Sequence, residues 1–204
     1  MSGADSTEKD LDGLTPIEFA AARGELPEWS HAGSKRRTHM ARVAGLLERW
    51  ARDLDLPESE VLRWAAAGWL HDSLRDADPE ALIDLVAPAE RDLPGALLHG
   101  PAAAARLAGD VDPRVQNAVR YHTIGHPDLD RLGRAVFLAD FLEPGRKAQR
   151  KWREGLRQRM PHEFDDVLVE VAAVRITETI DRRKPLRADT AAFWSAVVGA
   201  DEST

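Results

Sequence analysis

Apolar residues recur at intervals of three and four along most of this 204-residue chain, which is the spacing of one face of an α-helix. The clearest run shares a single helical face: Leu129, Leu132, Gly133, Val136, Phe137 and Asp140. No segment shows the alternation of apolar and polar residues that is typical of a half-buried strand. The sequence therefore predicts an all-α, single-domain helical bundle.

The chain divides into three parts on this pattern. Glycine and proline interrupt any long periodicity in residues 1–33, so we expect a loosely packed N-terminal extension there. Residues 34–146 form the predicted core, with helices expected to begin near Ser34, Ser59, Pro79, Pro94, Pro113 and Leu129. In the arginine-rich stretch 147–204 we expect two additional C-terminal helices that pack on the core.

The composition excludes several kinds of site. Because the chain has no cysteine, disulfides, zinc–thiolate sites, iron–sulfur clusters and cysteine nucleophiles are impossible, and any metal must be bound by histidine and carboxylates. No apolar run approaches the roughly 20 residues of a membrane span, and the N-terminus lacks a signal-peptide pattern, so we expect a cytoplasmic protein without a membrane partner. The net charge of −7 argues against a stable nucleic-acid partner, although a local group of cations could bind a small anion.

Histidine and aspartate residues occupy inward positions on successive predicted helices. Burial of an ionised carboxylate such as Asp140 costs several kcal/mol or more without a partner, and a metal ion would supply the opposite charge. The full set of candidate metal ligands, in chain order, is His39, His71, Asp72, His99, His122 and Asp140. Any one of these histidines alone is usually a core residue that is hydrogen-bonded to backbone, but their conjunction favours a metal centre.

Such a set can hold two divalent ions, because it offers several nitrogen and oxygen donors and a carboxylate that can bridge. Imidazole and carboxylate without thiolate suit iron, manganese, nickel or zinc and do not choose among them. A bridged pair lowers the pKa of a shared water and stabilises charge on a phosphoryl oxygen.

The order and context of these residues resemble the HD superfamily of metal-dependent phosphohydrolases, and within it the YqeK family of symmetrical bis(5′-nucleosyl)-tetraphosphatases. The matching stretches are SKRRTHMARV (34–43), GWLHD (68–72), LLHGP (97–101), YHTIG (121–125) and FLADFLEPGR (137–146). His-Thr-x-Gly together with Ala-Asp-x-x-Glu-Pro-x-Arg points to this particular family.

The resemblance implies two metal ions, and iron as the metal. The first ion would be held by His39, His71, Asp72 and Asp140. The second would be held by Asp72, His99 and His122, with Asp72 bridging.

The implied reaction is hydrolysis of diadenosine tetraphosphate at its middle phosphoanhydride, which gives two ADP, with a metal-bound hydroxide as nucleophile. His71, Asp72 and Arg75 would carry the catalysis. Arg75 stands where the family usually has a lysine. Arginine cannot release a proton near neutral pH, so it could clamp a phosphate but is a poor proton donor.

An acidic protein must gather cations locally to bind a polyphosphate. Together with the turn after His122, the candidate substrate contacts are Lys35, Arg36, Arg75, Thr123, Gly125, His126 and Arg146. The family pattern favours Arg36, whereas Arg146 could instead pair with Glu143. His126 precedes Pro127, which favours an exposed turn over a ligand contact.

Three other functions are compatible with the same residues. Another HD phosphohydrolase, such as a nucleotidase or phosphodiesterase, could use the same metal pair. An HD-type di-iron oxygenase could use a histidine–carboxylate di-iron centre, although the basic residues near the site count against it. A non-catalytic nucleotide-binding module would bind without turnover.

Overall fold

The structure, a computed structural model, describes residues 13–199, and these contain helices and no strand. The α-helices are α2 (Pro16–Ala22), α3 (Ser34–Asp53), α4 (Glu58–Leu70), α5 (Pro79–Leu82), α6 (His99–Arg106), α7 (Pro113–Tyr121), α8 (Arg131–Leu142), α9 (Arg150–Arg159), α10 (Phe164–Asp181) and α11 (Ala188–Val198). Three single 3-10 turns, η1 (Ile83–Leu85), η2 (Pro88–Glu90) and η3 (Gly95–Leu97), connect α5 to α6. The predicted all-α class is confirmed.

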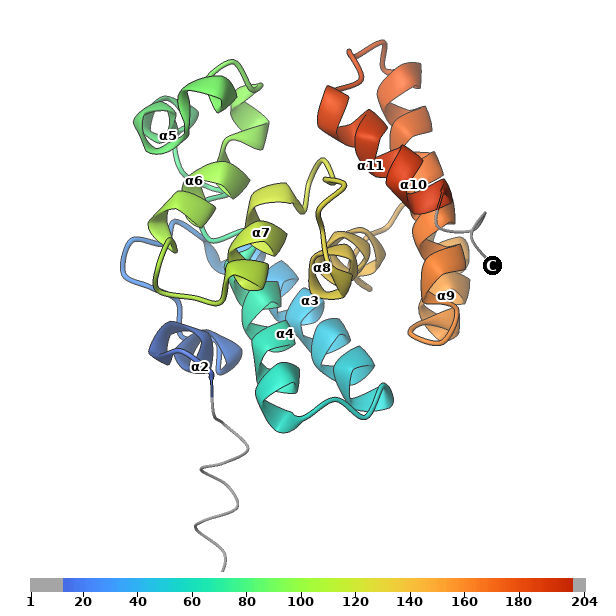
Figure 1. The fold of residues 1–204 in the computed structure, drawn as a ribbon, viewed down its shortest axis with the longest axis horizontal. Coiled ribbons are helices and arrows are strands. Elements are labelled where there is room, and N and C mark those ends of the chain that lie inside the picture. Colours follow the sequence, from blue (N-terminus) through green and yellow to red (C-terminus); the bar gives the residue numbers. More distant parts are fainter. Residues whose placement is uncertain (1–12, 200–204) are drawn as a thin grey trace, which may run out of the picture.

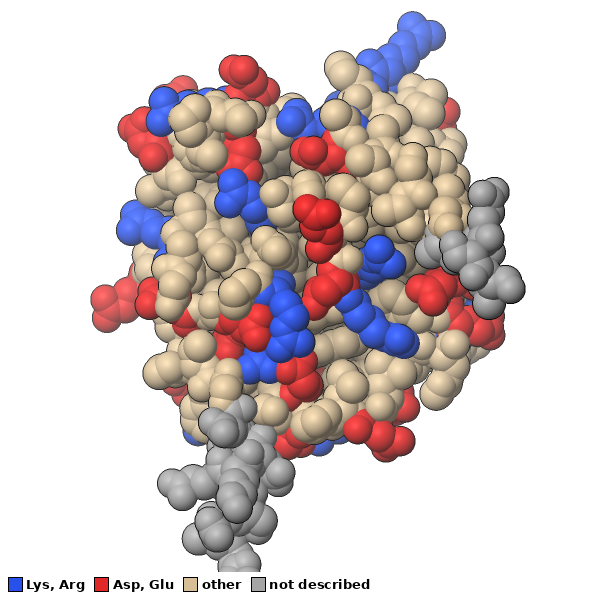
Figure 2. Space-filling model, viewed as in Figure 1, with Lys and Arg blue, Asp and Glu red and all other residues tan. Residues whose placement is uncertain are grey.

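Helices α3, α4, α7 and α8 form the centre of the bundle, with α5 and α6 on one side of it and α9, α10 and α11 on the other (Figure 1). The apolar faces predicted from the sequence meet here, and Leu47, Leu70 and Val136 are fully buried. Among the residues described, no helix is long and apolar enough to cross a membrane. On the face in Figure 2, positive and negative side chains are interspersed.

A close approach of α3 to α4 depends on Gly68. A Cβ atom at this position would lie 2.6 Å from the Cα and 2.8 Å from the backbone nitrogen of Ala44, closer than real Cβ atoms come. Glycine therefore lets the two helix backbones touch, one turn before α4 ends and the chain reaches His71.

The expectation of a loosely packed N-terminal extension is wrong for the part that the structure describes; residues 1–12 lie outside it. Helix α2 packs on α4, and its Glu18 is fully buried beside Arg63, with 3.7 Å between carboxylate and guanidinium. Arg63 also pairs with Glu60 and, at 3.5 Å, with Asp112. A buried charge needs such partners, and periodicity alone does not reveal them because the partners are distant in sequence.

Helix boundaries differ from the prediction at three places. Helix α4 begins after Pro57, whose fixed φ suits a helix start, so Ser59 lies inside the helix and does not cap it. The helix expected from Pro94 begins at His99 instead, after the 3-10 turn η3. The C-terminal part has a third helix, α9, which is mostly polar and buries few residues, Leu156 among them, so its apolar face is too narrow to detect.

Candidate metal centre

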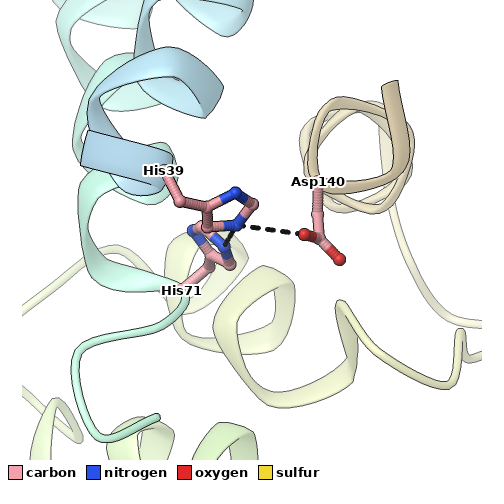
Figure 3. Close-up of side chains that lie close together, drawn as sticks. All are labelled: His39, His71 and Asp140. Carbon is pink, nitrogen blue, oxygen red and sulfur yellow. Dashed lines mark hydrogen bonds and ion pairs between the residues drawn. The ribbon is translucent and has the colours of Figure 1, made fainter. Parts of the chain in front are cut away.

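The six candidate ligands come from five segments of the chain and converge in the middle of the bundle. His39 lies on α3, His99 begins α6 and Asp140 lies on α8, whereas His71 and Asp72 follow α4 and His122 follows α7. All six are buried, with no more than 9% of any residue exposed. Figure 3 shows His39, from α3, and His71, from the end of α4, on one side of the site and Asp140, from α8, on the other.

The Asp72 carboxylate lies between two groups of ligands. Its Oδ2 atom is 3.6 Å from Nε2 of His39 and 3.6 Å from Nε2 of His71. Its Oδ1 atom is 3.1 Å from Nε2 of His99 and 3.5 Å from Nε2 of His122. Each oxygen therefore faces a different pair of imidazoles. Asp140 Oδ1 adds to the first group, 3.1 Å from His39 Nε2.

Backbone carbonyls fix the orientation of three imidazoles. The Nδ1 atoms of His71, His99 and His122 lie 2.7, 3.1 and 2.8 Å from the carbonyl oxygens of the residues three positions earlier. A carbonyl only accepts hydrogen bonds, so each Nδ1 carries a proton, and Nε2 is the nitrogen left to face the centre of the site.

The Nε2 atoms of His99 and His122 face one another at short range, 3.1 Å apart. Two lone pairs at this distance need a proton or a cation to satisfy both, so this donor set fits a cation. The Nε2 atom of His39 lies 3.3 Å from that of His71. Two overlapping groups have the spacing to hold a metal ion: His39, His71 and Asp140, and His71, Asp72 and His122.

Two of the histidines have strongly shifted pKa values in opposite directions. Burial alone would lower the pKa of His39, but hydrogen bonds to Asp140 and Glu143 overcome it and raise this pKa to about 9. Complete burial lowers the pKa of His71 to about 4. Despite its burial, contacts with His39 and Arg146 hold the pKa of Asp140 well below its ordinary value. The metal-free site therefore carries a proton on His39 and none on His71 at neutral pH.

We expect the metal-free protein to lose stability as the pH rises above neutrality. The folded pKa of His39, about 9, exceeds its ordinary value of 6.5, so protonated His39 stabilises the fold fully below pH 6.5, and this contribution is lost as the pH rises through 9. Between pH 7 and 8.5 the loss amounts to about 1–2 kcal/mol. Urea unfolding at several pH values measures it, with His39→Gln as the variant in which this slope disappears. An equal slope in that variant would contradict the assignment.

Three arginines converge on the two carboxylates. Arg36 Nη1 donates to Asp72 Oδ2 at 2.6 Å. Arg146 pairs with the Asp140 carboxylate, and its Nε donates to the Asp140 carbonyl at 3.2 Å. Arg175 Nη1 lies 3.8 Å from Asp140 Oδ2. The site thus gathers positive charge within an acidic protein, as binding of an anion requires.

A cavity of about 560 Å³ opens on the His39 side of the centre and holds several of the predicted substrate contacts. Lys35, Arg36 and Arg146 line it together with His39. The alternative pairing of Arg146 with Glu143 is also present, at 3.8 Å, but its contact with Asp140 is closer.

The remaining predicted substrate contacts lie on the His99 and His122 side. Burial lowers the pKa of His99, and the charges of His122 and, to a smaller extent, Arg75 add to the decrease, so Arg75 is on this side of the centre. Thr123 Oγ1 is 3.0 Å from His122 Nε2.

The turn after α7 is closely packed. Gly125 has φ +73° and a Cβ there would lie 2.3 Å from Phe193, so this position requires glycine. Its N–H donates to the Tyr121 carbonyl at 2.8 Å and is not free for a ligand, contrary to the expected substrate contact. His126 is not a simple exposed turn residue, because it stacks on Tyr121 with ring centroids 4.2 Å apart.

The sequence interpretation did not identify Arg42 and Arg175, which support the ligands. It named Glu143 only as a possible partner of Arg146. Glu143 is buried, lies 3.4 Å from His39 Nδ1 and pairs with Arg42, so it orients His39. Arg175 also donates to the Thr123 carbonyl and lies over the Phe137 ring, 4.6 Å from its centroid. The signal for Arg175 was a lone cation inside an apolar helical run, and the signal for Glu143 was its spacing of three from Asp140.

Comparison with known proteins fits this geometry. The sequence model of the HD domain matches residues 36–145, more than half of the chain and all six candidate ligands. The chain belongs to the HD domain family.

Three curated relatives carry one name, "Bis(5'-nucleosyl)-tetraphosphatase, symmetrical". The one from Staphylococcus aureus is 34% identical over 133 residues, 61% of this chain and 64% of that protein. Those from Halalkalibacterium halodurans and Bacillus subtilis are each 30% identical, over 50% and 60% of this HD-domain chain, and 55% of each relative is covered. The chain thus spans less than two thirds of the length of these relatives.

A solved structure has the same fold. It is described as a predicted HD superfamily hydrolase involved in NAD metabolism from Clostridium acetobutylicum. It superposes with a TM-score of 0.71 at 24% identity, covering 82% of this HD-domain chain and 91% of the other.

Proposed function

We propose that this protein is a metal-dependent phosphohydrolase that cleaves diadenosine tetraphosphate symmetrically into two ADP. The observation that carries the proposal is the Asp72 carboxylate, whose two oxygens face two separate pairs of imidazoles, as a ligand that bridges two metal ions would. The shared name of the three curated relatives supports the substrate and the symmetry of cleavage.

The ligands would suit two divalent ions and do not choose among iron, manganese, nickel and zinc; the resemblance to the YqeK family favours iron. His39, His71, Asp140 and Asp72 Oδ2 would hold one ion, and His99, His122 and Asp72 Oδ1 the other. Ions bound there lower the pKa of a coordinated water and stabilise charge on the phosphoryl oxygens.

The protein's own residues bind and orient the phosphate chain. Lys35, Arg36 and Arg146 line the cavity on the His39 side and offset the substrate's negative charge. Arg75, whose charge acts on His99, would serve as a phosphate clamp through its fork of hydrogen-bond donors. In the overall reaction, the oxygen of water joins one of the two middle phosphorus atoms, and the bridging oxygen leaves with the other ADP.

Product analysis tests this function. The protein is loaded anaerobically with ferrous iron, or separately with manganese, and incubated with diadenosine tetraphosphate before the nucleotides are separated. We expect ADP as the sole product. A mixture of AMP and ATP would contradict symmetrical cleavage. An unchanged dinucleotide in metal-loaded protein would reject the substrate, and other phosphate esters and then oxygen uptake would distinguish the remaining functions.

A further inference from the structure

A second cavity, of about 270 Å³, lies on the other side of the metal centre from the cationic cavity. Its walls come from the segment between α5 and α6, from the turn after α7 and from the start of α11. Figure 1 shows these elements together at the top of the view, and the space-filling view is indented between them (Figure 2).

The lining of this second cavity combines apolar and aromatic side chains with four charged ones, Glu90, Arg120, Arg187 and Asp189, of which Arg120 and Glu90 pair with each other. Leu93, Leu97 and Ile124 contribute aliphatic surface. The rings of Tyr121 and His126 are stacked, 22° from parallel, and both residues line the cavity. Flat aromatic faces beside aliphatic side chains are the surroundings that a heteroaromatic base prefers.

The cavity also offers a hydrogen-bond donor without a partner. Arg187 lines the wall, and its Nε atom is buried with no hydrogen-bond partner among residues 13–199. That atom is covered by protein, so the outer part of the Arg187 guanidinium is the part that could donate to a ribose hydroxyl or a base acceptor.

Thr123 joins this cavity to the metal centre. Its side chain lines the cavity, while its hydroxyl is 3.0 Å from Nε2 of His122. Pro101 also lines the cavity and is two residues from His99. The cavity therefore lies next to the His99 and His122 side of the centre, within reach of a ligand whose phosphates lie there.

The two cavities on either side of the centre differ in chemistry. In the first, Lys35, Arg36 and Arg146 outnumber the acidic residues Asp76 and Glu143, which suits phosphates. In the second, the stacked rings of Tyr121 and His126 suit a base. The volume of the second cavity lies just below the roughly 300 Å³ at which cavities for small organic ligands begin, so it fits one nucleoside and not a whole dinucleotide.

We propose that the cavity bordered by Tyr121, His126 and Arg187 binds one nucleoside of the nucleotide substrate and thereby selects nucleotides over bare polyphosphates. The inference rests on the proposed function, because it assumes a nucleotide whose phosphates lie at the metal centre. It assigns His126 and Tyr121 to the base and Arg187 to a polar group of the nucleoside.

Equilibrium binding tests the proposal with two ligands that share a diphosphate. Titration calorimetry compares ADP and inorganic pyrophosphate on the metal-loaded wild type and on two variants, His126→Ala and the matched control His162→Ala, whose exposed histidine lies outside both cavities. We expect the wild type to bind ADP at least about tenfold more tightly than pyrophosphate, because only ADP has a base to stack. His126→Ala should weaken ADP binding by about fivefold or more and leave pyrophosphate binding unchanged. His162→Ala should change neither.

The proposal would be overturned if His126→Ala bound ADP and pyrophosphate more weakly by the same factor, or if its affinity for ADP did not fall. Photolabelling with 8-azido-ADP then locates the base directly. We expect the label in the tryptic peptides 92–106 or 121–131, whereas label in 38–42 or 135–146 would place the base in the cationic cavity instead. Both measurements report binding, so they stand apart from hydrolysis: a protein that failed to cleave the dinucleotide would reject the proposed function without deciding where the nucleoside binds.

Discussion

Replacing Asp72 with asparagine is expected to lower kcat for diadenosine tetraphosphate by at least about 1000-fold, more than the roughly 10- to 100-fold typical of losing an outer-shell partner of a metal ligand. The carboxylate offers one oxygen to His39 and His71 and the other to His99 and His122. An amide keeps the shape, but it loses the negative charge and replaces one oxygen by an NH₂ group that cannot bind a metal.

The same variant should bind fewer metal ions per chain, as measured by plasma mass spectrometry after dialysis. Asp84→Asn is the matched control, because Asp84 is exposed on η1 and lines neither cavity at the centre. We expect it to keep full activity and metal content. Wild-type kcat in Asp72→Asn would contradict the role of Asp72.

Substituting alanine for Gly68 is expected to destabilise the fold by about 3 kcal/mol, at the upper end for an overpacked contact. The added Cβ would lie 2.6 Å from the Cα of Ala44, and a backbone atom cannot move aside as a flexible side chain can. Helices α3 and α4 would have to separate, and they carry His39 and lead directly into His71. Metal affinity should therefore fall together with stability.

Gly45→Ala is the matched control on the opposite helix. Its new Cβ would meet nothing within 4 Å, so alanine's higher helix propensity should stabilise the protein by about 0.5–1 kcal/mol. Urea unfolding of both variants measures the change in the free energy of unfolding, which should have opposite signs in the two. Equal effects at the two glycines would show that the close approach at Gly68 does not matter.

The periodicity of apolar residues was sufficient to predict the helices that have wide apolar faces. The run that ends at Asp140 became α8, and the stripe that contains His39 became α3, with both polar residues directed inward as predicted. The apolar stripes predicted only that each polar side chain points inward, and they could not show that these side chains converge in space. The structure brings them within hydrogen-bonding range of one another.

Features that depend on contacts between distant segments could not be predicted. The docking of α2 depends on Glu18 and Arg63, which lie 45 positions apart and read separately as surface charges. The support of Asp140 by Arg175 joins α8 to α10. The crossing angles of four helices determine which imidazoles each Asp72 oxygen faces. No local sequence pattern encodes these crossing angles.

Anomalous X-ray scattering from crystals of the metal-loaded protein tests the dinuclear centre most directly. We expect two ions per chain, about 3.5–4 Å apart, with Asp72 between them. His39, His71 and Asp140 should surround one ion, and His99 and His122 the other. A single ion, or a metal bound away from Asp72, would contradict the account.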